Sequence, residues 1–407
     1  MKRKWLPVLI VSLMVLMVTG SGLSADKPIK LGFVYIMSGP AATYGQFAKQ
    51  GADLAIDEIN KAGGINGRKV EGLFEDDTGK SDVGIRVVRK LVYENEADAI
   101  IGIDSSGVVS AVAPVMKELK TPLIITHAAV PDVTGSNCNP YTFRVSLNIE
   151  QNVGMASAIA SEAKAKVWTT VGPDYSFGHQ SWEYFQKYLK KKRPDVTFLP
   201  DSEAAFSPTA TTDFSAFITK VMNSRADGVL ISLWGGNLID FVRQASDVGF
   251  FDGKREVLMT LGAATEVLYA LKEKMPTGVW VGTRYWFQAN ETGANKAFVE
   301  AYKKRFDVYP SYNAHGAYAA VKVYAAAAAK AGSVDKEKII KALEGLTIDL
   351  PIGKTTIRAG DHQAVSDGTW GRTAADPGIP IRILKPMRHF SGNEITPAVE
   401  ETGCKMQ

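Results

Sequence analysis

The chain has 407 residues, of which 47 are Lys or Arg and 43 are Asp or Glu, so its formal net charge is only +4. Three of the basic residues stand together at the amino terminus, and without them the charge is nearly balanced. A chain of this length normally forms two domains, and it lacks the clustered basic surface that binds nucleic acid. We therefore expect a globular protein with no nucleic-acid partner.

The first 25 residues have the pattern of an export signal. A basic trio, Lys2 to Lys4, precedes an apolar run from Trp5 to Val18, and small residues follow. The run is short for a membrane span, and no cysteine stands at the cleavage region to receive a lipid. We expect residues 1–25 to be removed and the mature protein to be soluble in the periplasm, without a lipid anchor.

Short apolar strands alternate with amphipathic helices along the rest of the chain. The first series has expected strands at 30–37, 69–74, 97–103 and 122–127 and helices at 41–60, 81–93 and 108–118. The second has strands at 166–172, near 196, at 227–234 and 256–261 and helices at 177–191, 214–223 and 238–248. A strand at 278–287, helices at 294–306, 314–330 and 336–346 and a last strand at 379–387 complete the chain. This alternation predicts an α/β protein with parallel sheets covered on both faces.

Gly63, Gly64 and Gly67 are spaced like the glycines of a phosphate-binding loop. A helix precedes them and a strand follows, whereas a dinucleotide-binding loop has the reverse order. We therefore interpret them as a helix end and a turn. The chain also has no HExxH, GxSxG, P-loop or CxxC motif and only five scattered histidines. We expect no enzyme activity, no metal and no cofactor.

Cys138 and Cys404 are the only cysteines. An even pair in an exported protein predicts one disulfide, and two separate thiols are the alternative. A disulfide would fix the carboxyl-terminal tail to the first half of the chain.

A series of segments carries a family resemblance. In chain order they are "MSGPAATYGQFAKQGADLAIDEINKAGGINGRKV", "IIGIDSSGVVSAVAPV", "TPLIITHAA", "PYTFRVS", "DYSFGH" and "FVRQASDVGF". Together they resemble the periplasmic solute-binding proteins of branched-chain amino-acid ABC importers. The resemblance implies a type I periplasmic binding fold, in which two doubly wound parallel-sheet lobes are joined by three crossover strands. The implied crossovers lie near 143–148, 282–286 and 361–363, with lobe 1 at 26–146 and 285–360 and lobe 2 at 147–284 and 361–407.

In open parallel sheets a ligand lies beyond the carboxyl ends of the strands, which directs attention to the loops there. The resemblance implies that Tyr44 covers the ligand, that Ser106 binds its carboxylate and that Ala128 meets it through backbone groups. The alternative is that Tyr44 is a core residue. Ser105 and Ser106 precede a helix, so a hydroxyl and free N–H groups can hold an anion there, or the serine can cap its own helix. His127 is a further candidate, with a structural role as the alternative.

Asp76 and Asp77 look like a catalytic pair. We interpret them as capping the following helix or completing a network at the hinge.

In the second lobe the resemblance points to Phe177 beside the ligand, and Trp234 and Asn237 follow a strand end. Gly262 stands about where amino-acid binders have an acid that pairs with the ligand ammonium, and Val130 about where they have a threonine. An ammonium buried without an anion is costly. These departures argue against a simple α-amino acid, unless a nearby acid replaces the missing one.

Glu266 is the candidate for that replacement. Arg284 can form two parallel bonds to a carboxylate, and Tyr285 or Trp286 can stack on a planar ligand. Arg284 paired with an acid in the hinge is the alternative. Tyr312 is a weaker candidate for the cleft wall.

We therefore expect a monomeric substrate-binding subunit of an ABC importer that captures a small amino acid or related carboxylate and delivers it to the membrane permease. Two alternatives remain open: a sensory binding protein that presents its ligand to a receptor, and a subunit specific for aromatic carboxylates or amides.

Overall fold

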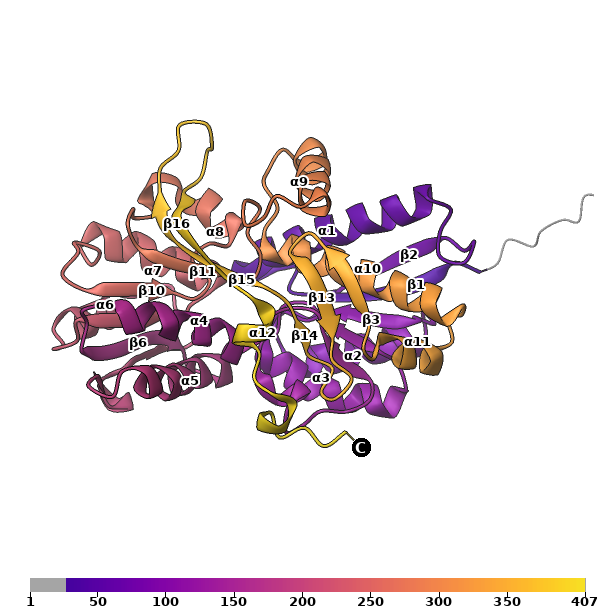
Figure 1. Cartoon of the computed structure of the whole chain (residues 1–407), viewed down its shortest axis with the longest axis horizontal. Helices are drawn as coiled ribbons and strands as arrows, with labels where there is room; N and C mark the ends of the chain where they lie inside the picture. The colour runs from indigo at the N-terminus through magenta and orange to yellow at the C-terminus, as the bar shows by residue number, and fades with distance from the viewer. Residues whose placement is uncertain (1–26, 407) are drawn as a thin grey trace, which may run out of the picture.

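The computed structural model describes residues 27–406, so the export signal expected at residues 1–25 lies outside the described residues. Figure 1 shows two lobes side by side, each built on its own β-sheet. The expected α/β architecture of two lobes with parallel sheets is confirmed. Within the described residues, no helix combines the length and apolar character needed to cross a membrane.

The first sheet is entirely parallel. In spatial order its strands are β2 (Val70–Asp76), β1 (Ile29–Tyr35), β3 (Ala99–Gly102), β4 (Leu123–Ile125) and β5 (Thr142–Arg144). Both faces are buried, and consecutive residues alternate between them. In β3, Ile100 joins the apolar cluster of α2 (Ser81–Tyr93) and α3 (Ser106–Leu119), whereas Ile101 joins the larger core that includes α1 (Ala42–Lys61). This explains why the central strands β3 and β4 are continuously apolar, whereas the edge strand β2 carries Glu71, Glu75 and Asp76.

The second sheet is mixed. In spatial order its strands are β16 (Ile383–Phe390), β15 (Gly368–Ala374), β11 (Trp280–Thr283), β10 (Glu256–Met259), β9 (Gly228–Ile231), β6 (Val167–Pro173) and β7 (Thr197–Phe198). A short strand, β8 (Ala205–Ser207), also pairs with β6. β15 is antiparallel to both β11 and β16, and the remaining pairs are parallel.

Further helices and a small hairpin sheet complete the two lobes. The second lobe has α4 (Ile149–Glu162), α5 (Ser176–Lys192), α6 (Ser215–Met222), α7 (Gly235–Asp247) and α8 (Thr265–Leu271). The chain then returns to the first lobe and forms α9 (Gly293–Phe306), α10 (Tyr312–Ala331) and α11 (Lys336–Leu343). Helix α10 packs along α1. An antiparallel sheet follows, made of β12 (Thr347–Leu350), β13 (Gly353–Ile357) and β14 (Ala364–Val365).

The chain passes between the lobes after β5, after β11 and after β14. The first and third passages lie together, because the backbone N–H of Arg144 donates to the carbonyl of His362 (3.0 Å) and Arg144 bridges to Gln363. The residue-by-residue division into lobes stays a prediction. Near its expected boundary at residues 360 and 361, β14 still pairs with β13 as far as Val365.

The glycine cluster ends α1, as the sequence predicted. Helix α1 stops at Lys61, and Gly63, Gly64 and Gly67 all have positive φ angles (102°, 81° and 80°). Residues with a Cβ rarely adopt such φ angles, which explains the glycines at these positions.

Asp76 and Asp77 hold the loop that leads into α2. Asp76 accepts from the backbone N–H groups of Met37 (3.0 Å) and Thr78 (2.7 Å), and Asp77 accepts from that of Gly79 (2.8 Å).

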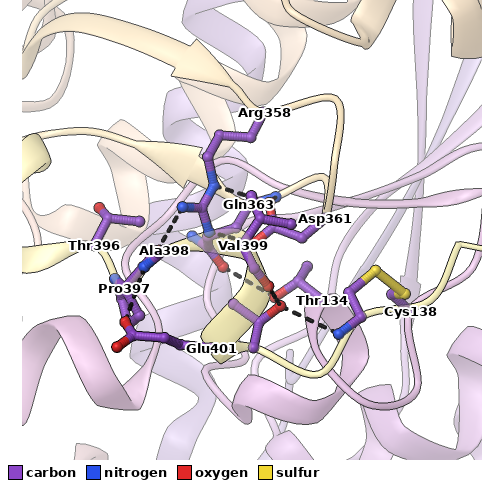
Figure 2. Close-up of polar contacts among 12 residues, drawn as sticks. Thr134, Cys138, Arg358, Asp361, Gln363, Thr396, Pro397, Ala398, Val399 and Glu401 are labelled. Atoms are coloured by element: carbon purple, nitrogen blue, oxygen red, sulfur yellow. Dashed lines mark hydrogen bonds and ion pairs between the residues drawn. A yellow bond between two sulfur atoms is a disulfide. The ribbon is translucent and has the colours of Figure 1, made fainter.

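The C-terminal tail, residues 391–406, leaves β16 in the second lobe and ends against the first lobe. Figure 2 shows its contacts: Arg358 donates to the carbonyl of Pro397 (2.6 Å), and Cys404 forms the disulfide with Cys138 that the cysteine pair suggested. Gln151 of α4 also donates to Thr396 (2.8 Å). The tail therefore lies across the passages between the lobes.

Candidate functional site

A small cavity lies between the lobes, at the carboxyl ends of strands from both sheets. We call it the inner cavity, and its volume is about 20 Å³. Its lining residues are the aromatic Tyr44, Tyr175, Phe177, Trp234 and Tyr312, the polar Asp104, Ser106, His127 and Arg284, and the aliphatic Ala129 and Leu261. Seven of the sequence-predicted residues therefore meet here: Tyr44, Ser106, His127, Phe177, Trp234, Arg284 and the weaker candidate Tyr312. Their roles toward a ligand stay predictions.

The aromatic side chains close the cavity from both lobes. The Tyr44 hydroxyl, on α1, accepts a hydrogen bond from the backbone N–H of Gly235 at the start of α7 (3.0 Å). The Tyr44 ring lies 5.5 Å from that of Trp234 and 5.9 Å, edge to face, from that of Tyr312. Burial raises the pKa of Tyr44 well above its ordinary value, so its hydroxyl stays neutral. The lobes are thus in contact over the cavity.

Arg284 supplies a buried cation to the cavity. It is 4% exposed, its Nη1 donates to the carbonyl of His127, and its Nε has no hydrogen-bond partner. Its guanidinium lies 5.4 Å from the centre of the Tyr312 ring. Among residues 27–406 no carboxylate forms an ion pair with it, and burial lowers its pKa. A buried charge normally has a counter-charge, so this guanidinium suits an anion.

Arg144 is a second buried arginine, but all of its nitrogens have hydrogen-bond acceptors. Its Nε donates to the carbonyl of Ala128 (3.0 Å) and its Nη2 to that of Val130 (2.5 Å). Its Nη1 donates to Thr134 (2.9 Å) and to Gln363 (3.0 Å). Every nitrogen of Arg144 has an acceptor, so this residue fixes the loop after β4 to the third passage between the lobes.

Ser106 stands at the first position of α3 and faces the cavity. Its hydroxyl accepts from the backbone N–H groups of Ala129 (3.3 Å) and Val130 (3.2 Å), which orders the loop after β4. A hydroxyl that accepts two hydrogen bonds keeps its own proton for donation. Ser106 is therefore a suitable donor to an anion in the cavity.

Asp104 and His127 form a pair at the ends of β3 and β4. The His127 Nδ1 lies 3.0 Å from Asp104 and 3.0 Å from Thr126, and its Nε2 lies 3.0 Å from the carbonyl of Asn313. The other oxygen of Asp104 accepts from the backbone N–H of Ile36 (2.7 Å). Sequence reasoning missed Asp104, although its place directly after β3 and before the serines is where the strand-end rule applies.

Three predicted residues, Ala128, Gly262 and Tyr285, do not line the cavity. The N–H and carbonyl of Ala128 are bonded to Ile103 (2.8 Å) and Arg144. A Cβ added to Gly262 would lie 2.6 Å from Val281, inside the second lobe. The Tyr285 hydroxyl donates to Asn295 (2.7 Å), away from the cavity. The neighbours Ala129 and Leu261 line the cavity in place of Ala128 and Gly262.

The remaining candidates have other surroundings. Val130 belongs to the apolar cluster beneath α3, and Trp286 is fully buried against Phe287. Glu266, on α8, accepts a hydrogen bond from Asn313 at the start of α10, and burial raises its pKa to about 7. It does not line the cavity.

A wider pocket adjoins the inner cavity. This mouth pocket measures about 560 Å³ and shares Tyr175 and Trp234 with the inner cavity. The Trp234 Nε1 donates to the Tyr175 hydroxyl (3.0 Å). Two further predicted residues, Ser105 and Asn237, line the mouth pocket.

The family model of a periplasmic binding protein matches residues 28–376. The chain belongs to the periplasmic binding protein family. The match includes both sheets up to β15 and every residue that lines the inner cavity.

Curated relatives of this periplasmic binding protein have low identity over most of their length. The Leu/Ile/Val-binding protein homolog 4 of Brucella melitensis is 24% identical over 96% of both chains. The leucine-, isoleucine-, valine-, threonine- and alanine-binding protein of Pseudomonas aeruginosa is 24% identical over 81% of this chain and 85% of its own.

Solved structures extend the similarity to the whole fold. An amino acid ABC transporter substrate-binding protein from Pseudomonas fluorescens has a TM-score of 0.82 and 25% identity, covering 94% of this chain and all of its own. A solute-binding protein of an ABC transporter from Rhodopseudomonas palustris, in complex with 4-hydroxybenzoate, has a TM-score of 0.79 and 23% identity over 90% and 97% of the chains. The type I periplasmic binding fold is therefore confirmed. The chain is a periplasmic substrate-binding protein of the ABC transporter type.

Among residues 27–406 no group of three or more His, Cys, Asp or Glu side chains is placed to hold a metal ion.

Proposed function

We propose that this protein captures a small planar carboxylate, such as an aromatic acid, in the inner cavity and delivers it to the permease of an ABC importer. It acts in the periplasm, to which residues 1–25 export it, and it acts as a monomer. The ligand carboxylate takes the place of the missing counter-charge of Arg284, and the aromatic side chains hold its ring. Ligand entry requires the lobes to separate, since the closed cavity is small. Closure over the ligand then creates the shape that the permease recognises.

The observation that carries this proposal is the buried guanidinium of Arg284, whose Nε has no hydrogen-bond partner and which forms no ion pair with any carboxylate of residues 27–406. Leaving such a charge unpaired costs several kcal/mol, and a bound carboxylate removes this cost. Ser106 adds a hydroxyl donor on the first lobe, so both lobes contact the same ligand.

A free α-ammonium has poor partners in this cavity. Asp104 supplies the carboxylate among the described lining residues; its Oδ2 accepts from the N–H of Ile36 (2.7 Å), and its Oδ1 lies 3.0 Å from His127 Nδ1 but makes no hydrogen bond. Glu266 lies outside the lining and is engaged by Asn313. An ammonium buried here would have to share Asp104 with His127 and Ile36, which disfavours α-amino acids.

The second candidate function is amino-acid binding. Asp104 favours it, because a small rotation of that carboxylate away from His127 would present an anion to an ammonium. The names of the Brucella and Pseudomonas relatives agree with this alternative, whereas the ligand of the Rhodopseudomonas palustris protein agrees with the first.

Calorimetric titration of ligand-stripped protein separates the two functions. Benzoate, leucine, phenylalanine and the deaminated analogues 4-methylpentanoate and 3-phenylpropanoate are titrated in turn. We expect benzoate and 3-phenylpropanoate to bind at micromolar concentration and each amino acid to bind about 100-fold more weakly than its analogue, because its ammonium must share Asp104 with His127 and Ile36. Micromolar binding of leucine without binding of 4-methylpentanoate would establish amino-acid binding instead.

A further inference from the structure

The mouth pocket provides a second space beside the carboxylate anchor. It is far larger than the inner cavity, at about 560 Å³ against about 20 Å³, and Tyr175 and Trp234 line both. It lies between the lobes, because Gly107 of α3 and Asn237 of α7 both line it. A volume of this size is typical of small-molecule sites.

The walls of the mouth pocket carry no charge. No Lys, Arg, His, Asp or Glu is among its lining residues, whose polar members are Ser38, Thr78, Ser81, Ser105, Thr209 and Asn237. Ser105 occupies the N-cap position of α3 but makes no side-chain hydrogen bond to the helix. Its hydroxyl is therefore free for a ligand. A charged group placed here would lack a counter-charge, whereas an apolar or hydrogen-bonding group would fit.

We propose that the mouth pocket is a second subsite, which receives the uncharged far end of an elongated carboxylate whose acid group is held at Arg284. This inference rests on the proposed function, because the anchor at Arg284 sets the orientation of the ligand. The acid end lies deep in the inner cavity beside the guanidinium of Arg284, and the other end passes Tyr175 and Trp234 to reach neutral walls. The site therefore selects monocarboxylates with a neutral extension and rejects dicarboxylates.

Three benzoates test the chemistry of the far end. Benzoate, 4-propoxybenzoate and terephthalate are titrated by calorimetry into the ligand-stripped full-length mature protein. We expect 4-propoxybenzoate to bind about tenfold more tightly than benzoate, because its alkyl chain becomes buried in the mouth pocket. Terephthalate should bind more weakly than benzoate, because its second carboxylate meets no cation.

A substitution that fills the mouth pocket tests its location. Gly107 is the second residue of α3, its backbone is not in the left-handed region, and only Ser105 Oγ lies within 4 Å of an added Cβ, at 3.7 Å. We expect Gly107→Leu to lower the affinity ratio of 4-propoxybenzoate to benzoate from about ten to about one. Gly154→Leu on α4, where an added Cβ has no neighbour within 4 Å, is the matched control and should keep the ratio.

The outcomes separate this inference from the proposed function. Failure of all three benzoates to bind would overturn both. Binding of benzoate with no gain for 4-propoxybenzoate, or a gain that Gly107→Leu does not reduce, would overturn the second subsite and leave the proposed function standing. Thermal melts of both glycine variants show whether they are folded.

Discussion

Two buried arginines show how the partners of one residue type decide its role. Arg144 gives hydrogen bonds from all its nitrogens to neutral acceptors, whereas Arg284 leaves Nε without one. The first guanidinium is satisfied without a ligand, so it contributes to the fold. The Arg284 guanidinium gains its missing partner only when an anion binds. The ligand-free protein is therefore destabilised by the desolvation of this charge.

Methionine at each position should therefore change stability in opposite directions. We expect Arg284→Met to stabilise the ligand-free protein by roughly 1 to 3 kcal/mol, because it removes an unpaired buried charge, and to abolish carboxylate binding. Arg144→Met should destabilise the protein by about 3 kcal/mol or more, because several buried acceptors lose their donor.

Urea unfolding without ligand measures both effects, and calorimetry with benzoate measures binding. Arg284→Met with lowered stability and unchanged binding would show that Arg284 belongs to the hinge and not to the ligand site.

At this scale the sequence predicted the loops of the site better than the side chains within them. Ala128 and Gly262 were expected at the ligand, but their neighbours Ala129 and Leu261 line the cavity. The loops follow from the positions of strand ends, whereas the direction of each side chain reverses with a shift of one residue. The unpaired state of Arg284 also depends on residues far away in the chain, so no local pattern indicates it.

At the scale of elements, the first turn of α10 joins the two lobes. Tyr312 lines the inner cavity, the carbonyl of Asn313 faces His127, and the side chain of Asn313 donates to Glu266 on α8. The turn is held in place because Ser311 caps it, accepting from the N–H groups of Asn313 (3.1 Å) and Ala314 (3.3 Å). One helix start therefore links the cavity wall to a buried carboxyl group.

Glu266 should make stability depend on pH. Burial raises its pKa from the ordinary 4.5 to about 7, so the folded protein holds a proton that the unfolded chain releases in this range. The contribution of Glu266 to the free energy of unfolding is therefore fully present below pH 4.5. It is lost as the pH rises to 7, and its size is about 3 kcal/mol. Glu266→Gln should remove it.

Chemical denaturation at pH 5 and pH 8 measures the effect as the difference between wild type and Glu266→Gln. Burial also raises the pKa of Asp77 to about 7, so Asp77→Asn is the control for a separate contribution of the same sign. Equal pH dependence in wild type and Glu266→Gln would contradict the assignment to Glu266.

The hairpin sheet β12–β14 was not predicted from the sequence. Its strands are short and paired only with each other, and β12 and β13 alternate exposed and buried positions without a long apolar run. Central parallel strands such as β3 and β4 were predictable because both of their faces are buried and their residues are apolar or glycine. Small antiparallel strands depend instead on pairing partners, which a single segment does not reveal.

At the scale of the molecule, the lobes meet on more than one side of the cleft. Tyr44 and Gly235 join them over the inner cavity, and Gln180 of the second lobe donates to Asp132 of the first (2.9 Å). The C-terminal tail adds a covalent connection through Cys138 and Cys404.

Removal of this disulfide should destabilise the whole protein. Its two cysteines are 266 residues apart, and closing so long a loop restricts the unfolded chain. We expect the Cys138→Ser, Cys404→Ser double variant to lose about 2 to 4 kcal/mol in urea unfolding. Wild type treated with a reductant should behave like the double variant. Free alkylation of both thiols without reductant would show that the bond is absent.

The same bond closes residues 138–404 into a covalent ring, and all three passages between the lobes belong to it. A single cut in a ring opens it but does not divide it. A protease that cleaves the exposed loop around Pro377 and Gly378, between β15 and β16, would therefore leave one molecule of unchanged mass apart from the added water. Its two fragments would separate only after unfolding and reduction, so the nicked protein keeps both halves of the ligand site together.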